Sequence, residues 1–178
     1  MIKKLRIKLI ATSMASLFLV LFVIGGIVGI INHKKIVEDA DRILEILEEN
    51  EGTFPKMDPG EKKEGPHGMS AEIPYESRYF SVLFDANGTI ILTDTSKIAS
   101  IDTETAADYA SEVWNKGTEK GFLDDYRYWK CSSDDGMRII FLDCRRQLSN
   151  FHNFLLTTFA VSGVGLLSVF ILMVCLSA

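Results

Sequence analysis

A run of aromatic and charged residues is the best candidate for chemistry in this chain of 178 residues. The run reads Asp124-Asp-Tyr-Arg-Tyr-Trp-Lys130, and a shorter pair of the same kind, Arg78-Tyr79, precedes it. Aromatic faces with a few fixed charges commonly line small-ligand sites. We therefore take six residues as candidate ligand contacts, with either arginine meeting an anionic group: Arg78, Tyr79, Tyr126, Arg127, Tyr128 and Trp129. The competing interpretation is that the aromatic residues are strand core and that Arg127 is solvated.

Other kinds of chemistry have no support in the sequence. The three histidines, His33, His67 and His152, are too scattered to form a metal-ligand set. No glycine-rich phosphate loop occurs, and no serine or cysteine has a partner base. Segment 32–150 carries 15 basic and 24 acidic residues, a net charge of −9, so nucleic acid is not an expected partner. No catalytic residue, metal or cofactor is predicted for this chain.

The candidate residues fall in segment 78–144, whose pattern predicts a small α+β core. Two strands are expected around the turn Asn87-Gly88, since both residues tolerate positive φ. A helix capped by Asp102 or Thr103 should follow, and then a second hairpin. The expected elements are strands 79–85 and 89–94, helix 103–116, and strands 122–131 and 137–143. In the first strand, Phe80, Val82 and Phe84 should face one side, and Tyr79 and Leu83 the other.

Segment 33–50, which precedes this core, has the periodicity of an amphipathic helix. It starts so close to an apolar stretch that the two are expected to form one rod of about 40 residues, roughly 60 Å long. Its apolar stripe suits packing on its own domain and a dimer seam equally well. Segment 51–77 contains all four prolines and is predicted to be a mobile loop.

Two apolar stretches predict membrane spans at 9–31 and 151–178. Residues 9–31 and 153–178 carry no charge, and about 20 apolar residues cross a bilayer. The first stretch is longer than the apolar region of a secretory signal, about 7–15 residues, and no small-residue cleavage site follows it. It is therefore predicted to be an uncleaved anchor.

Four positive charges in the basic tail, 1–8, favour a cytoplasmic amino terminus. Basic residues on the far side weaken this preference, but long loops translocate largely regardless of charge. The predicted arrangement places residues 32–150 outside the cytoplasm, in a multi-pass protein of the cell membrane.

The three cysteines are predicted to be free thiols. Cys175 lies in the second span. If the second hairpin pairs Cys131 with Arg138, Cys144 lies about 20 Å farther along its strand. A disulfide needs Cα atoms within about 7 Å.

The layout of a basic end, one span, an extracytoplasmic domain and a second span resembles the input region of bacterial sensor histidine kinases. Three segments are similar to sensor regions of such kinases from clostridia-like Gram-positive bacteria: Pro74-Tyr-Glu-Ser-Arg-Tyr-Phe-Ser-Val82, Asp125-Tyr-Arg-Tyr-Trp129 and Ile139-Ile-Phe-Leu-Asp-Cys-Arg-Arg-Gln147. The resemblance implies a PAS-like or Cache-like fold, a homodimer, and a following kinase part that uses ATP and Mg²⁺ and a response regulator.

None of the kinase residues is present up to Ala178, so the resemblance implies no catalytic position here. The expected function is sensory input to a two-component phosphorelay, in a fragment of a longer receptor or a truncated gene product. The same layout serves chemoreceptors and membrane nucleotide cyclases. A free-standing two-span interaction protein is the alternative from a different class.

Overall fold

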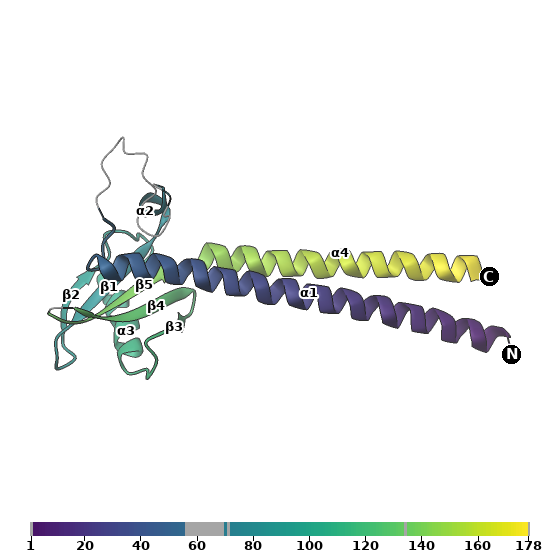
Figure 1. Cartoon of the computed structure of the whole chain (residues 1–178), viewed down its shortest axis with the longest axis horizontal. Coiled ribbons are helices and arrows are strands. Elements are labelled where there is room, and N and C mark those ends of the chain that lie inside the picture. The colour runs from purple at the N-terminus through teal and green to yellow at the C-terminus, as the bar shows by residue number, and fades with distance from the viewer. Residues whose placement is uncertain (1, 56–69, 71, 134, 178) are drawn as a thin grey trace. The chain divides into compact units, whose positions relative to one another are not determined.

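The computed structural model describes residues 2–55, 70, 72–133 and 135–177 and divides the chain into two compact units (Figure 1). One unit runs from Ile36 to Arg146 and contains the sheet. The other combines the segment up to Lys35 with the segment from Gln147 onward. Two long helices, α1 (Ile2–Glu49) and α4 (Arg145–Ser177), have residues in both units.

The helical unit pairs the first part of α1 with most of α4. A Cβ atom on Gly29 would lie 3.5 Å from a methyl carbon of Leu155, which is ordinary contact distance. The rings of His33 and Phe151 lie 6.0 Å apart. Small residues at a helix contact let two backbones approach closely. Gly29 therefore marks one place where the two helices meet.

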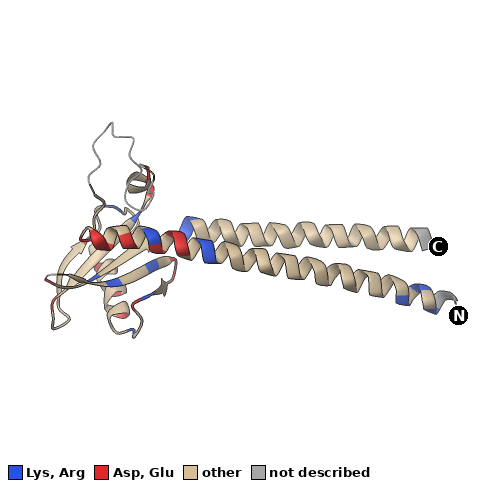
Figure 2. Cartoon of the chain, viewed as in Figure 1, with Lys and Arg blue, Asp and Glu red and all other residues tan. Residues whose placement is uncertain are grey.

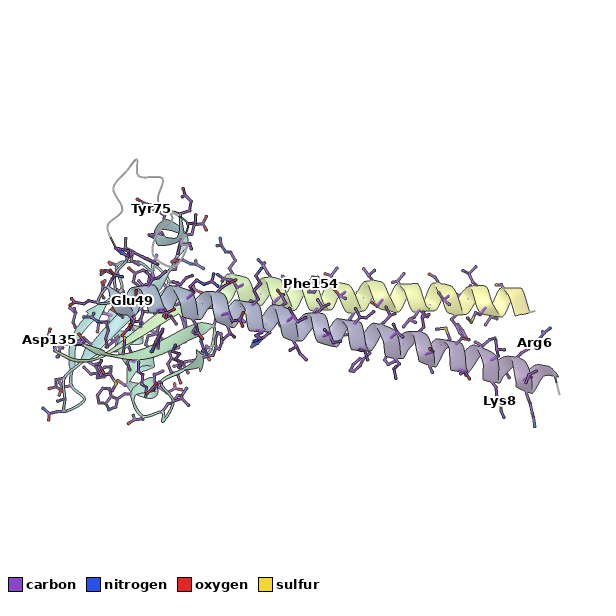
Figure 3. All side chains as sticks on the ribbon, viewed as in Figure 1. Arg6, Lys8, Glu49, Tyr75, Asp135 and Phe154 are labelled. Carbon is purple, nitrogen blue, oxygen red and sulfur yellow. The ribbon has the colours of Figure 1, made fainter. Side chains whose placement is uncertain are left out.

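Both helices contain a stretch that is long and apolar enough to cross a membrane. Figure 2 shows no charged residue along the middle of either helix, and Figure 3 shows Arg6 and Lys8 near the amino end of α1. The apolar side chains are exposed, as at Phe22 (62%) and Phe154 (45%). A core helix of a soluble domain would bury such residues. By length and composition, two candidate membrane spans flank the sheet domain.

The carboxyl end of α1 closes with a backbone motif that satisfies its last carbonyl groups. The Gly52 amide donates to the Leu47 carbonyl at 2.7 Å, and the Glu51 amide donates to Glu48 at 3.3 Å. Glu51 has φ of 54°, a left-handed conformation that glycine usually supplies at this position. At its other end α1 begins at Ile2, so the prediction that the first apolar stretch and the amphipathic segment form one continuous helix is confirmed.

The sheet has five antiparallel strands in the order β2-β1-β5-β4-β3. Its last strand in sequence, β5, lies at the centre between β1 and β4. Two shorter helices, α2 and α3, also belong to the described part of the domain. The bounds are α2 Ile73–Glu76, β1 Tyr79–Phe84, β2 Ile90–Asp94, α3 Thr103–Trp114, β3 Lys120–Leu123, β4 Tyr126–Ser133 and β5 Gly136–Asp143.

Helices cover both faces of the sheet, and every residue of β1 is buried for that reason. On one face, alternate strand residues form a cluster with the buried side of α3: Phe80, Val82, Phe84, Tyr126, Tyr128, Ile139, Phe141, Ala106, Ala110 and Val113. The other face lies against the end of α1, whose buried residues are Ala40, Leu44, Ile46 and Leu47. The stripe of α1 thus packs on its own domain, as one of the two interpretations expected.

The largest correction to the sequence-based elements concerns the second hairpin. Segment 122–131 was expected to be one strand, but it contains the end of β3, a turn and most of β4. The turn lies at Asp124, whose φ is 51°, a conformation that aspartate tolerates better than most residues. The second hairpin is therefore a meander of three strands. Helix α3 begins where it was predicted and ends two residues earlier, at Trp114. Asp102 caps it by accepting from the Thr105 amide at 2.8 Å.

The first hairpin differs from expectation in its turn. Of the predicted pair, only Gly88 has a positive φ, 82°. Asp85 organises the turn instead, because its carboxylate accepts from the amides of Asn87 (2.9 Å) and Thr89 (2.7 Å). These hydrogen bonds hold the pKa of Asp85 below its usual value. The loop predicted for 51–77 was expected to lack regular structure, but the short helix α2 lies within it at Ile73–Glu76, and residues 56–69 and 71 lie outside the described residues.

Candidate functional site

The centre of the sheet leads into α4 through a single residue. β5 ends at Asp143, α4 begins at Arg145, and only Cys144 lies between them. The Cys144 amide donates to the Asp125 carbonyl, and the Asp143 amide donates to the Arg78 carbonyl, both at 2.9 Å. The strand therefore stays bonded on both sides up to the residue before the helix.

Asp143 is the buried carboxylate of this junction, with a side chain 1% exposed. One of its oxygens accepts from the Arg145 amide at 2.9 Å, in the first turn of α4. The other pairs with the Arg78 guanidinium at 3.0 Å. A carboxylate at a helix amino end satisfies an amide that the helix leaves free and interacts favourably with the helix dipole. Asp143 thus fixes where α4 starts relative to β1 and β5.

Arg145 ties the start of α4 to the turn between β3 and β4. Its Nε donates to the Asp125 carboxylate at 3.2 Å, and its Nη2 donates to the Tyr126 hydroxyl at 3.3 Å. On the other side of this turn, the Tyr109 hydroxyl donates to Asp124 at 2.8 Å. This hydrogen bond, more than any other cause, raises the pKa of Tyr109 to about 12. The turn that the sequence-based prediction missed is therefore part of the junction.

A second ion pair joins the end of α1 to the sheet. The Arg127 guanidinium binds the Asp41 carboxylate through two parallel hydrogen bonds, Nε to Oδ1 at 2.8 Å and Nη2 to Oδ2 at 3.1 Å. The Arg127 side chain is 12% exposed and that of Asp41 is 29% exposed. A fork of this kind, largely shielded from water, fixes both position and angle. It holds α1 on β4, the strand next to β5.

The two cysteines of the domain are buried and chemically quiet. Cys131 pairs with Arg138 in the register of β4 and β5, which is the pairing on which the prediction of free thiols was based. All three cysteines are free, as predicted. Burial raises the pKa of both Cys131 and Cys144 to about 11. Since the thiolate is the nucleophile, these side chains are poorly reactive at neutral pH.

The six candidate ligand contacts do not share one surface. Tyr126 and Tyr128 are buried in the cluster under α3, whereas Arg127 alternates with them and faces α1. Trp129 is half-buried, with the ammonium of Lys120 3.1 Å from the ring centre. On β1 and the residue before it, Tyr79 is buried against the edge of Phe54, and Arg78 pairs with Asp143. Both arginines thus have carboxylate partners, and ligand contact by the six stays a prediction.

Sequence reasoning singled out the two arginines but missed their partners, Asp41 and Asp143. The signal for Asp143 was available, because it is the only charge in the apolar run Ile139-Ile-Phe-Leu-Asp-Cys144. A charge at such a place must be paired when the strand is buried. No such pattern singled out Asp41, because it is one of several acidic residues in the polar part of an amphipathic helix.

Among the described residues, no three histidine, cysteine, aspartate or glutamate side chains gather as a metal site would require. Comparisons with protein-family models, with curated proteins and with solved structures found no match to this chain. The paired charges of the site hold the end of α1 and the start of α4 on the sheet.

Proposed function

We propose that this chain is the membrane-anchored sensory input module of a bacterial two-component histidine kinase. One observation carries the proposal: the central strand of the domain, β5, leads into an apolar helix of 33 residues after a single intervening residue. Because only Cys144 separates β5 from α4, no flexible linker could absorb a movement of the end of β5. The sheet is thus joined, without an intervening loop, to a helix that is long and apolar enough to cross a bilayer.

The proposed mechanism needs two packings of the domain whose populations a stimulus changes. The Asp41–Arg127 pair would hold α1 against β4, while Asp143 and Arg145 would hold the start of α4 against β1, β4 and the β3–β4 turn. A stimulus that alters the sheet between these two anchors would move α4 relative to α1. Small shifts or rotations of helices are a common form of such switching.

In this proposal the basic tail is cytoplasmic, the sheet domain lies outside, and α4 leads back to the cytoplasm. The module works as a homodimer and passes its state to a kinase part, which phosphorylates a response regulator. A PAS-like or Cache-like fold is part of the proposal, and the antiparallel five-stranded sheet with helices on both faces is compatible with it.

A fusion tests the proposal directly. The chain would be joined after Ala178 to the dimerisation and catalytic part of a histidine kinase, and autophosphorylation would be measured in membrane vesicles. Asp143→Asn keeps the shape of the side chain but removes the charge that anchors Arg78 and the start of α4. We expect this change to alter kinase output by about fivefold or more, because allosteric coupling is typically worth about 1–3 kcal/mol.

Asp135→Asn is the matched control, because Asp135 is an exposed aspartate at the far end of β5, beside the turn from β4 (Figure 3). Its output should equal that of the unchanged fusion. If Asp143→Asn and Asp135→Asn give the same output while both proteins reach the membrane at equal levels, the junction does not transmit. That result would favour the interaction-protein alternative.

A further inference from the structure

A polar pocket lies where the end of α1 meets the turn between β4 and β5. It has a volume of about 100 Å³ and is lined by Glu48, Glu51, Cys131, Ser132, Ser133 and Arg138. All six residues belong to the sheet domain. The pocket is separate from the junction at the start of α4, and the proposed function makes no use of it.

Arg138 is the unusual member of this pocket. Its Nε is fully buried and, among the described residues, has no hydrogen-bond partner. Buried donors are nearly always paired, because an unpaired one loses its hydration without compensation. Gly52 makes room for this side chain because glycine has no Cβ. A Cβ atom at that position would lie only 3.1 Å from Cδ and 3.3 Å from Nη1 of Arg138. Because Nε has no accessible surface, a ligand in the pocket would meet the guanidinium through its outer nitrogens, Nη1 and Nη2.

The pocket also carries negative charge. Glu48 and Glu51 both line it, and no ion pair joins either of them to Arg138 within the part of the chain that the structure describes. The left-handed conformation of Glu51 belongs to the cap that ends α1, and this cap places its side chain at the pocket. Charges of both signs therefore line one small pocket without a direct ion pair between them in the described part of the chain.

This combination restricts the chemistry of an occupant. A simple anion would meet two carboxylates, and a simple cation would meet a guanidinium. A molecule with a carboxylate and an ammonium group can satisfy both, with the serine hydroxyls as further partners. The volume limits the size of the ligand. An apolar cavity of about 150 Å³ holds benzene, which has six heavy atoms, so about 100 Å³ suits a ligand of about four heavy atoms, close to the five of glycine.

We propose that this pocket binds a small zwitterionic amino acid, with its carboxylate on Arg138 and its ammonium group on Glu48 and Glu51. If the proposed sensory function is correct, the bound amino acid is the stimulus, and in this respect the binding site rests on that function. Its position fits that role, since the pocket bridges the end of α1 and the two strands that α1 covers.

The test measures binding on the full chain in detergent micelles, by calorimetry and by the unfolding temperature. L-alanine and glycine are the probes, and propionate and ethylamine, which each lack one of the two charged groups, are the matched controls. We expect the amino acids to raise the unfolding temperature progressively with concentration, as any ligand of the folded state does. Neither propionate nor ethylamine should do so at the same concentrations.

Arg138→Met keeps an unbranched side chain of similar reach and removes the guanidinium. We expect it to weaken L-alanine binding by about 30-fold or more, since a ligand charge loses its partner. The unliganded variant should unfold at or above the temperature of the unchanged protein, because an unpaired donor has been removed. Arg42→Met, at an exposed arginine on α1, should bind as the unchanged protein does. If Arg138→Met does not fold, Glu48→Gln provides the same comparison.

No binding of either amino acid, equal binding of propionate and L-alanine, or full binding by Arg138→Met would each overturn the proposal. Kinase output of the fusion separates the two proposals. Binding without any change of output would contradict the role as stimulus and leave the site standing. If Asp143→Asn changes kinase output but no amino acid binds, the proposed binding site is wrong and the proposed function stands.

Discussion

Phe80→Ala should destabilise the sheet domain by about 4 kcal/mol, the typical cost of removing a fully buried phenylalanine side chain. Phe80 is 0% exposed. Its ring stacks on Phe141 of the neighbouring strand at a centroid distance of 4.5 Å and meets the ring of Tyr126 edge-on at 5.5 Å. Removing it leaves a cavity between the sheet and α3 that rigid strands cannot close. Since domains are typically stable by only about 5–15 kcal/mol, the variant should be close to unfolding.

Urea unfolding of the full chain in micelles measures this effect. Trp114 and Trp129 are the only tryptophans in the sequence and both lie in the sheet domain, so fluorescence follows that domain alone. Ile91→Ala is the control, because Ile91 lies on the edge strand β2 and is 53% exposed. It should cost less than about 1 kcal/mol. Equal losses in the two variants would contradict the two-faced core described above.

Asp41→Asn should destabilise the domain by about 3 kcal/mol. The change leaves the Arg127 guanidinium, 12% exposed, without its carboxylate, and breaking a largely buried pair usually costs about 3–5 kcal/mol. The lower end of that range applies because Asp41 keeps 29% exposure. Replacing both partners, as Asp41→Leu with Arg127→Met, should recover most of the loss, because it leaves no unpaired charge.

The same fluorescence measurement applies to this second prediction. Asp39→Asn is its control, because Asp39 is two residues away on α1, and its contact with Arg42 is long (4.0 Å) and exposed. Exposed pairs on helices contribute only about 0.3–0.5 kcal/mol. If Asp41→Asn and Asp39→Asn behaved alike, the fork between α1 and β4 would not hold the helix in place.

Much of the fold could be predicted because local patterns and tertiary packing agree. The alternation in β1 separates Phe80, Val82 and Phe84 from Tyr79 and Leu83, and the core cluster contains the first three and neither of the other two. The cap of α3 and the register of the second hairpin also follow local chemistry. Where the spacing of apolar residues and the turn residues predict the same element, the sequence alone is enough to locate that element.

The site was predicted less well, because its decisive contacts are between residues far apart in the chain. Asp41 and Arg127 are 86 positions apart, and no local pattern selects one carboxylate of α1 over its neighbours. The turn at Asp124 was missed because aromatic residues on both sides of it suggested one continuous strand. The central position of β5 could not be derived either, because strand order depends on how the whole sheet packs.

The central claim is that the state of the sheet domain reaches the pair of long helices. Gly29 and Leu155 lie at a contact of α1 and α4. The rate of disulfide formation between cysteines placed at these two positions therefore reports how closely the two helices approach there. The background would carry Cys175→Ser, and the buried Cys131 and Cys144 would stay unreactive. In membrane vesicles at neutral pH, we expect Asp41→Asn to change the rate of disulfide formation by about fivefold or more. Asp39→Asn should leave it unchanged. Identical rates in all three proteins, with the domain folded in each, would contradict transmission from the sheet to the helices.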